Sequence, residues 1–425
     1  MSKTYNIAII GAGATGLAAA YKLTQDGHAV TVLERNNEIG GLAASLKVQG
    51  ARLERFYHHL FATDHAFINL VKEIGLGDKL YFKALPTGFY YHGQQYDFGT
   101  PLEILRLPVI PFGDRLRLAA SSMYLKLLKD HRPLESINML AWCRRYAGKK
   151  TTEVIWEPLL RSKFGKHADD VTLAWFWARV HYRTFKLGYV HGGFDQVYEV
   201  LADKIKREGG EILLNQYIKA IAQKSAEDPV VITMEDGSTK TYDRVICTTP
   251  QPVFAKMIGA PDHNDLWQAR YLGATCFILE LKKSLVPYYW LSINEAGFPF
   301  LAVIEQTRLT GTAEYNGRHI VYIGNYVARD DWRFTEDPKT LLKKYLPYLK
   351  KVNPDFKESD ILDWHFSKAG FAQPIITPDY HNHIPPHQTA LPGVWLATMS
   401  QVYPQDRGQN YAVKMGFEVA ELAKQ

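Results

Sequence analysis

The sequence contains few cysteines. Cys143, Cys247 and Cys276 are scattered through 425 residues. They form no CxxC pair and have no histidine at a zinc-ligand spacing, so neither a disulfide framework nor a structural zinc site is expected. We therefore expect no metal centre and a reducing compartment, the cytoplasm.

Long apolar runs are also missing. No uninterrupted apolar stretch reaches the length of a membrane span. The first residues lead straight into the apolar stretch Ile7 to Ile10, without the longer apolar block and small-residue cleavage site of a secretory signal. A cytoplasmic protein is expected, either soluble or attached peripherally to a membrane.

Internal repeats, low-complexity tracts and a basic, aromatic nucleic-acid-binding module are absent as well. The net charge of +6 would favour an anionic substrate or a negative membrane surface. Because the basic residues are interleaved with acids along the chain, an ordinary solvated surface is the simpler interpretation. No nucleic-acid partner is expected.

What is present indicates a large globular protein. Hydrophobic residues make up 46% and charged residues 22% of the chain, which is an ordinary globular composition. A chain of this length exceeds what one hydrophobic core usually serves. Two closely associated domains are therefore expected.

The first forty residues have the pattern strand, glycine turn, helix and strand. The turn is Gly11-Ala12-Gly13-Ala14-Thr15-Gly16, in the context in which GxGxxG binds a dinucleotide. Its glycines permit a tight turn, a close approach of pyrophosphate and close helix packing, with the phosphates at the positive helix N-terminus. Glu34 ends the second strand, where its carboxylate can accept hydrogen bonds from a ribose.

The segment that follows Glu34 favours FAD over NAD. It reads Arg35-Asn36-Asn37-Glu38-Ile39-Gly40-Gly41-Leu42-Ala43-Ala44-Ser45. The paired glycines allow the backbone to lie close to a phosphate or the flavin, and Arg35 offers a charge to the same region. A plain surface turn is the structural alternative.

Three groups of motifs resemble the flavin amine oxidase superfamily, which includes protoporphyrinogen oxidases, carotenoid and squalene-type desaturases and, more distantly, UDP-galactopyranose mutases. They lie at residues 11–45, at 192–246 from Gly192-Gly193-Phe194, and at 393–412 from Gly393-Val394-Trp395. The resemblance implies FAD as cofactor and an α/β fold. A Rossmann-type, glutathione-reductase-like FAD-binding domain would be assembled from the discontinuous segments 1–85, 190–260 and 376–425. An α+β substrate-binding domain, a helical lobe plus a β-sheet, would comprise residues 86–189 and 261–375.

The same resemblance predicts the cofactor contacts. The backbone near Ile218 would meet adenine, and the helix after Gly408 would point at the flavin pyrimidine. Thr398-Met399-Ser400-Gln401 replaces the Gly-Asp of many relatives, so the usual ribityl-binding acid is missing and Asp406 is a candidate substitute. The expected FAD-binding residues are Gly11, Gly13, Ala14, Thr15, Gly16, Glu34, Arg35, Gly40, Gly41, Leu42, Ile218, Thr249, Asp406, Gly408, Gln409 and Asn410.

A substrate side is expected next to the flavin. The segment Arg55 to Phe61 lies where relatives bring a chain past the ring, and His59 best matches a histidine that recurs there, although a structural role for His58 and His59 explains the pair too. Aromatic residues in the substrate domain would suit an apolar or amphipathic substrate, and many of them will be ordinary core. Substrate contacts are predicted for Arg161, Arg179, Arg183, Trp290 and Arg407.

The leading functional hypothesis is an FAD-dependent oxidase, dehydrogenase or desaturase that takes a hydride from a hydrophobic or amphipathic small molecule onto flavin N5. The alternatives are an isomerase resembling UDP-galactopyranose mutase, with no net redox change, and a flavin-binding chaperone. The substrate, electron acceptor, oligomeric state and any covalent flavin attachment stay open. Peripheral membrane contact through Leu102 to Leu128 is a further hypothesis, and an ordinary helical lobe explains the same residues.

Overall fold

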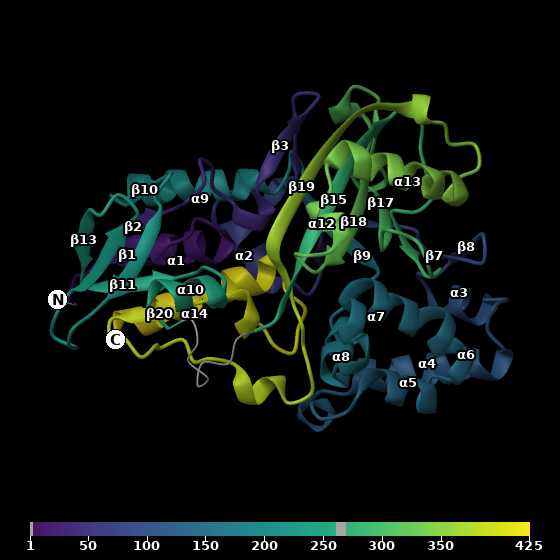
Figure 1. Ribbon diagram of the computed structural model, residues 1–425, viewed down its shortest axis with the longest axis horizontal. Helices are drawn as coiled ribbons and strands as arrows, with labels where there is room; N and C mark the ends of the chain where they lie inside the picture. The colour runs from purple at the N-terminus through teal and green to yellow at the C-terminus, as the bar shows by residue number, and fades with distance from the viewer. Residues whose placement is uncertain (1–2, 261–268) are drawn as a thin grey trace.

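The computed structural model describes residues 3–260 and 269–425. Its first unit is a five-stranded, all-parallel sheet with the order β10-β2-β1-β14-β20 (Figure 1). The strands are β1 (Asn6–Ile10), β2 (Ala29–Leu33), β10 (Glu211–Leu213), β14 (Arg244–Cys247) and β20 (Val394–Leu396). Three segments that are far apart in the sequence therefore form one sheet, as expected for the discontinuous FAD-binding fold.

Four strands of this sheet are largely buried on both faces, which explains their mainly apolar sequences, while the edge strand β10 is partly exposed. Ile7 and Ile9 of β1 face the core shared with the helices, while Ala8 and Ile10 face a three-stranded antiparallel sheet. That sheet consists of β11 (Ile218–Ala222), β12 (Val230–Met234) and β13 (Thr239–Tyr242). Strands β12 and β13 form a hairpin that turns at Asp236-Gly237.

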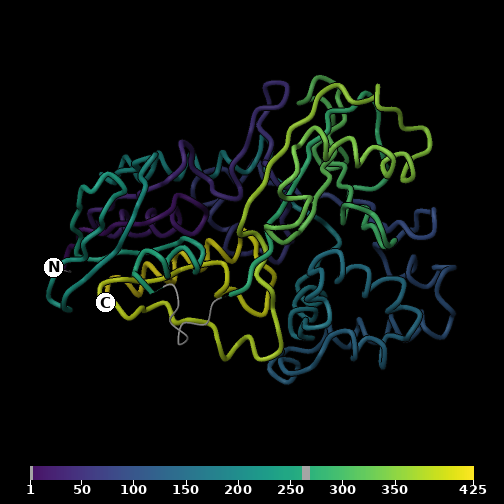
Figure 2. Tube along the Cα trace, in the orientation of Figure 1, coloured from purple at the N-terminus to yellow at the C-terminus, as the bar shows by residue number. Residues whose placement is uncertain are grey.

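Helices pack against the other face of the parallel sheet. They are α1 (Ala14–Gln25), α9 (Asp195–Arg207) and α14 (Gln409–Lys424), with α2 (His65–Glu73) packed on α14. Helix α10 (Gln251–Met257), which follows β14, lies on the side of the antiparallel sheet, against β11. The contact between α1 and α14 is close, because a Cβ atom on Gly416 would lie 2.5 Å from the Thr15 carbonyl oxygen. The last helix of the chain is thus held directly against the first, and the two termini lie at the same end of the molecule (Figure 2).

The second unit is a seven-stranded mixed sheet with the order β19-β15-β18-β17-β16-β7-β8. Its strands are β7 (Thr87–Tyr91), β8 (Gln94–Asp97), β15 (Tyr271–Leu281), β16 (Trp290–Ile293), β17 (Ala302–Glu305), β18 (His319–Val327) and β19 (Ile361–Pro374). Helix α13 (Pro338–Val352) packs on it through Leu341, Tyr345 and Leu349, and the short helices α11 (Thr307–Thr310) and α12 (Trp332–Thr335) lie at its connections. The first residues of the predicted segment 261–375, residues 261–268, lie outside the described residues.

A helical lobe forms the third part of the fold (Figure 1). It consists of α3 (Pro101–Arg106), α4 (Phe112–Leu127), α5 (Met139–Tyr146), α6 (Lys149–Thr151), α7 (Glu157–Phe164) and α8 (Leu173–His181). The lobe has a hydrophobic core of its own, in which Phe164, Trp175 and Trp177 are buried. The predicted helical character of this insertion is confirmed, and the domain boundaries themselves stay a prediction.

Short strands connect the units. They are the hairpin of β3 (Ser45–Val48) with β4 (Ala51–Glu54), and the sheet of β5 (Leu60–Phe61), β9 (Lys186–Val190) and β6 (Leu80–Ala84). The sequence before β5 carries the two adjacent histidines. The sheet therefore fixes these histidines beside the end of the helical lobe.

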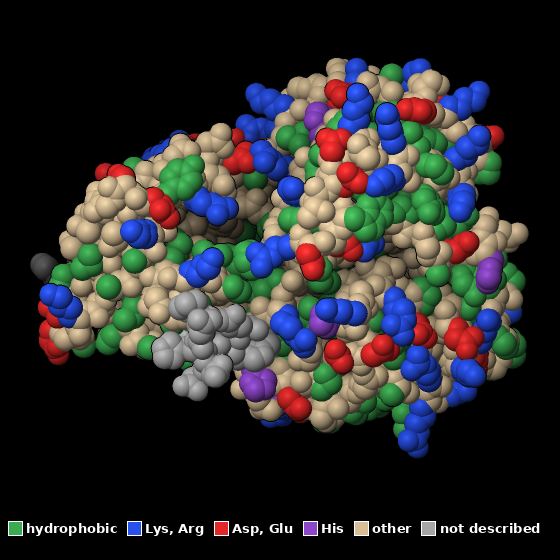
Figure 3. All heavy atoms as spheres, viewed as in Figure 1, with side chains coloured by type: hydrophobic (Ala, Val, Ile, Leu, Met, Phe, Trp, Pro, Cys, Tyr) green, Lys and Arg blue, Asp and Glu red, His purple; other side chains and the backbone are tan. Residues whose placement is uncertain are grey.

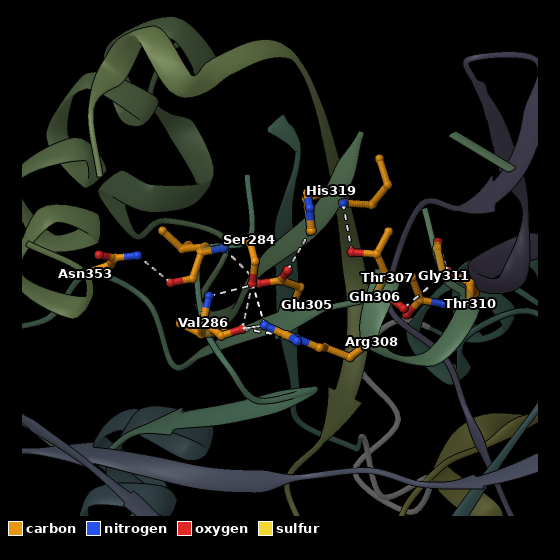
Figure 4. Close-up of polar contacts among 12 residues, drawn as sticks. Ser284, Val286, Glu305, Gln306, Thr307, Arg308, Thr310, Gly311, His319 and Asn353 are labelled. Atoms are coloured by element: carbon orange, nitrogen blue, oxygen red, sulfur yellow. Dashed lines mark hydrogen bonds and ion pairs between the residues drawn. The ribbon is translucent and has the colours of Figure 1, made fainter. Parts of the chain in front are cut away.

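A buried carboxylate stabilises the far end of the mixed sheet (Figure 4). Glu305, at the end of β17, is fully buried and accepts hydrogen bonds from the backbone N–H groups of Leu285 and Val286, both at 2.9 Å. Its other oxygen lies 3.1 Å from Nδ1 of His319. All of these partners belong to loops and strand ends of the sheet, so the network has a structural role.

Candidate functional site

The glycine-rich loop lies between β1 and α1, as predicted, and two of its glycines admit no side chain. A Cβ atom on Gly16 would lie 1.9 Å from the carbonyl oxygen of Gly11. Gly11 has φ +104°, and its Cβ would lie 2.5 Å from Oγ1 of Thr248. The loop therefore keeps its backbone bare at the N-terminus of α1, the geometry that binds a pyrophosphate.

The second glycine segment packs against the first. The N–H of Gly40 donates to the Ala12 carbonyl at 2.8 Å, and a Cβ on Gly41 would lie 3.3 Å from Cα of Gly13. Gly41 is exposed, whereas Ser45 Oγ is buried without a partner among the described residues. A plain surface turn does not explain this contact, and the two segments form one cradle that fits a dinucleotide.

Glu34 reinforces the same cradle. Its two carboxylate oxygens accept hydrogen bonds from the N–H groups of Ala12, at 2.7 Å, and Asn36, at 2.8 Å. The chain before Ile218 adjoins it, since the N–H of Gln216 donates to the Glu34 carbonyl at 2.8 Å. Each carboxylate oxygen has a second lone pair, so the ribose contact stays compatible with this arrangement.

The remaining predicted cofactor residues lie around this cradle and at the start of α14. Leu42, Ile218 and Thr249 are partly exposed, and Arg35 and Gly408 are exposed. Asn410 Oδ1 accepts a hydrogen bond from the N–H of Phe67 at 3.2 Å. The Gln409 side-chain oxygen accepts a hydrogen bond from the Tyr198 hydroxyl. Two nearby donors, Nε2 of Gln409 and Nε of Arg407, are buried without a partner among the described residues. Unsatisfied buried donors at a helix N-terminus fit the polar end of a flavin.

Asp406 has partners that the sequence did not reveal. Its Oδ2 accepts hydrogen bonds from Lys163 Nζ, at 2.6 Å, and from Arg179, and its Oδ1 accepts one from Gln373 Nε2 at 3.3 Å. Burial opposes ionisation, but the charges of Lys163, Arg179 and Arg407 hold the pKa of Asp406 well below its usual range. We call these five residues the Asp406 cluster. The predicted ribityl contact is untested, and the carboxylate is already shared among three side chains.

Aromatic faces surround the cations of this cluster. Nζ of Lys163 lies 5.2 Å from the ring centroid of Trp175, and the guanidinium of Arg179 lies 4.9 Å from the same ring. Arg407 lies over Tyr326 at 5.2 Å and donates to its hydroxyl. Burial lowers the pKa of Lys163 to about 7, although the Asp406 charge opposes that shift.

His59 lies on a connected aromatic wall. Its Nδ1 is 3.2 Å from the Tyr289 hydroxyl. Its ring centroid lies 6.3 Å from that of Trp290, with the two rings perpendicular. Trp290 in turn packs edge-on against Tyr57, with 5.2 Å between the ring centroids. Burial, with the charge of Arg183, lowers the pKa of His59 to about 3, so the imidazole is neutral at physiological pH. A neutral ring can accept or donate one hydrogen bond but supplies no positive charge.

Arg183 faces the same region. Its side chain is solvent-accessible, and burial and the charge of Arg179 lower its pKa to about 10. Figure 3 shows the molecule hollowed in the half that holds the parallel sheet, with Lys and Arg side chains at the edge of the hollow. The charges of Arg179 and Arg183 act on His59, whose ring packs against Trp290. Trp290 also packs on Tyr57, on which the charge of Arg407 acts, so these predicted residues are brought into one region.

Arg161 is not part of this region. It lies at the surface of α7, where it forms ion pairs with Glu157 at 2.8 Å and Asp169 at 3.3 Å. Lys163, two residues further along the same helix, is the buried cation instead. Gln373 on β19 and Tyr326 on β18 also belong to this region, although no sequence motif indicated them.

One group of possible metal ligands occurs among the described residues, consisting of Glu280, Asp363 and His365. The buried carboxylate of Glu280 is already occupied by Arg318 at 2.8 Å, Gln49 at 2.9 Å and His365 at 3.0 Å. Since Arg318 supplies the positive charge, the group is explained as an ion-pair network.

The fold and the cradle define a dinucleotide-binding flavoprotein. The family model for flavin containing amine oxidoreductases matches residues 14–420, so the chain belongs to this family and FAD is its cofactor. This membership confirms the family predicted from the motifs, which is one of FAD-dependent oxidoreductases. Among the described residues no helix is both long and apolar enough to cross a membrane.

Comparison with individual proteins agrees with the family. A putative flavin-containing monoamine oxidase of Mycobacterium tuberculosis, AofH, is 23% identical over 266 residues, and the match covers 58% of this chain and 57% of that protein. The chain therefore spans less than two thirds of the length of this curated relative.

Two solved structures share the fold over nearly the whole chain. A putative protoporphyrinogen oxidase from Exiguobacterium sp. 255-15 has a TM-score of 0.80 at 18% identity, over 100% of this chain and 99% of that one. Reduced UDP-galactopyranose mutase has a TM-score of 0.75 at 17% identity, over 98% and 95%. At such identities the likeness concerns the fold alone.

Proposed function

We propose that the protein is an FAD-dependent oxidoreductase whose substrate is an amphipathic molecule with an apolar body and at least one acidic group. The observation that carries the proposal is the excess of positive charge in the Asp406 cluster and at Arg183. Three cations contact or adjoin a single carboxylate there, between aromatic side chains. Such a site favours an anion with apolar surface and disfavours a cationic amine.

FAD, when bound, supplies the hydride acceptor. The residues of this chain bind and orient the substrate. Arg183 is the solvent-accessible cation that can bind an acidic group, because Arg179 is already engaged by Asp406. His59 and Trp290 form a neutral wall, on which a hydrogen bond from or to the imidazole can fix the substrate orientation.

Anaerobic reduction of the bound flavin tests the substrate class. The purified protein is mixed with a carboxylated porphyrinogen, a carotenoid hydrocarbon or an aliphatic diamine, and the flavin absorption is followed. Bleaching is expected with the acidic, apolar compound and not with the diamine. Reduction by the diamine alone would contradict the proposal and favour an amine oxidase. Re-exposure to air then shows whether oxygen is the electron acceptor.

A pair of arginine variants locates the acidic group. Arg183→Gln should raise KM for the reducing substrate about tenfold with a smaller effect on kcat, since a charge-assisted contact contributes roughly 1.5 kcal/mol. Arg161→Gln removes a guanidinium from the surface of α7 and is the matched control, expected to leave KM unchanged. Equal effects of the two substitutions would exclude Arg183 as the substrate anchor.

The cationic region supports a second candidate, an isomerase that binds the diphosphate of a sugar nucleotide without net redox change. Arginine side chains bind phosphate as readily as carboxylate. Dithionite-reduced protein incubated with UDP-galactopyranose distinguishes the candidates. Formation of the furanose isomer would establish the isomerase, and its absence, together with flavin reduction by a porphyrinogen, would establish the oxidoreductase.

A further inference from the structure

Exposed apolar side chains are concentrated on one part of the molecule. Of the twelve large hydrophobic residues with high exposure among the described residues, eight belong to the helical lobe and the turn that follows it. These eight are Leu102, Phe112, Leu116, Met123, Tyr124, Leu127, Tyr146 and Phe185. A cluster of this kind on a folded protein indicates an interaction surface.

Helix α4 carries the central part of this cluster. Phe112, Leu116, Met123 and Leu127 recur at helical spacing and are 64%, 49%, 57% and 69% exposed. The opposite side of the helix, at Leu118 and Leu125, is buried in the core of the lobe. The helix therefore has two apolar sides, and the described residues of the chain cover only one of them. We call Phe112, Leu116, Met123 and Leu127 the α4 face.

The charge of the chain is concentrated in the same place. Residues 101–150 contain ten Lys and Arg but four Asp and Glu, an excess of six positive charges. The whole chain has a net charge of +6, so the other 375 residues are balanced. The basic residues are interleaved with acids along the chain, as expected, but in this segment they outnumber the acids. Among the described residues Arg106, Lys129, Arg145 and Lys149 are exposed and lack a carboxylate within ion-pair distance.

We propose that the α4 face rests on an anionic phospholipid bilayer. An amphipathic helix that exposes Phe and Leu, and whose surroundings carry Lys and Arg, has the two features that bind such a surface in the plane of the headgroups. Tyr124 and Tyr146, on either side of Trp142, add aromatic rings of the type that collects at the lipid–water boundary. A second copy of the chain would cover the apolar side chains but would be repelled by the same positive charge.

The position of α4 relative to the site suits delivery of a membrane-dissolved substrate. This part of the inference rests on the proposed function. Nζ of Lys126 donates to the carbonyls of His181 at 2.6 Å and Arg183 at 2.8 Å. The C-terminal end of α4 is thereby attached to the segment that carries Arg183 into the site and exposes Phe185. An amphipathic molecule dissolved in the bilayer would meet the exposed Arg183 where the lobe meets the membrane.

Vesicle co-sedimentation of the FAD-loaded protein tests the lipid contact without any turnover. Binding is expected to vesicles that contain phosphatidylglycerol, at least tenfold tighter than to vesicles of phosphatidylcholine alone, and added salt should weaken it. Equal affinity for the two kinds of vesicle, or no binding to either, would overturn the proposal. Because the readout is sedimentation, its failure is distinct from a failure of the proposed activity.

The double variant Phe112→Glu with Leu127→Glu should lose at least tenfold in affinity for the anionic vesicles. Leu362→Glu, which places the same charge at a 44% exposed leucine of β19, is the matched control and should bind as the parent does. An unchanged flavin spectrum verifies folding. If the parent forms a concentration-dependent dimer that the double variant separates, and the variant still binds vesicles, the face is a contact between two copies and the proposal is wrong.

Discussion

The glycine cradle and the Asp406 cluster belong to the same candidate site but are built from different parts of the chain's chemistry. The cradle consists mainly of backbone, namely glycines and their N–H groups, and one side-chain carboxylate, Glu34, accepts hydrogen bonds from this backbone. The cluster consists of side chains from the helical lobe, β19 and the segment before α14, held by charge. The cradle should therefore respond to a change of volume, and the cluster to a change of charge or pH.

The largest effect is expected from a single methyl group in the cradle. Gly16→Ala would put Cβ against the Gly11 carbonyl, 1.9 Å away, where only backbone could move. We expect loss of FAD, measured as the ratio of flavin to protein absorption after purification. Gly113→Ala is the matched control, since Gly113 in α4 has open space around its Cβ position and should keep its flavin. Full retention of FAD by Gly16→Ala would show that the cradle is not the cofactor site.

A smaller effect, on stability, is expected when the charge of the cluster is removed. Asp406→Asn leaves Lys163, Arg179 and Arg407 without their counter-ion, and a broken, largely buried pair costs roughly 3 kcal/mol. Denaturant unfolding measures this cost. Asp169→Asn, which removes the exposed partner of Arg161, is the control and should cost about 0.5 kcal/mol or less. If both variants unfold alike, the cluster does not stabilise the fold.

The contrast also explains what could be read from the sequence. The cradle is local, because residues 11–45 contain both glycine segments and Glu34. Gly11, Gly16, Gly40 and Gly41 each have a positive φ or no room for a Cβ atom, and such requirements leave a pattern in the sequence. The central strands of the parallel sheet could be predicted for a similar reason, because burial on both faces makes them mainly apolar. Such features are expressed residue by residue in the sequence and need no knowledge of distant contacts.

The Asp406 cluster is drawn from four distant positions in the chain and leaves no such pattern. Arg161 was selected and Lys163 was not, although they lie two residues apart on α7. Two residues correspond to about 200° around a helix, so one side chain faces solvent and the other the core. The packing of α7 against β18 decides which of the two side chains is buried. The sequence of the helix does not indicate this orientation.

The smallest effect, and the one most specific to the cluster, is a pH dependence. The pKa of Lys163 is about 7 in the folded protein, below the value near 10.4 of an unfolded lysine. Between these values the unfolded chain binds one more proton, so this group makes stability rise with pH, by up to about 1.4 kcal/mol per unit. Compared with Lys163→Met, the parent should therefore gain about 1 kcal/mol in unfolding free energy from pH 7 to pH 8. Exposed Lys166→Met is the control and should follow the parent curve; if Lys163→Met follows it as well, Lys163 stays charged and Asp406 holds an ordinary ion pair.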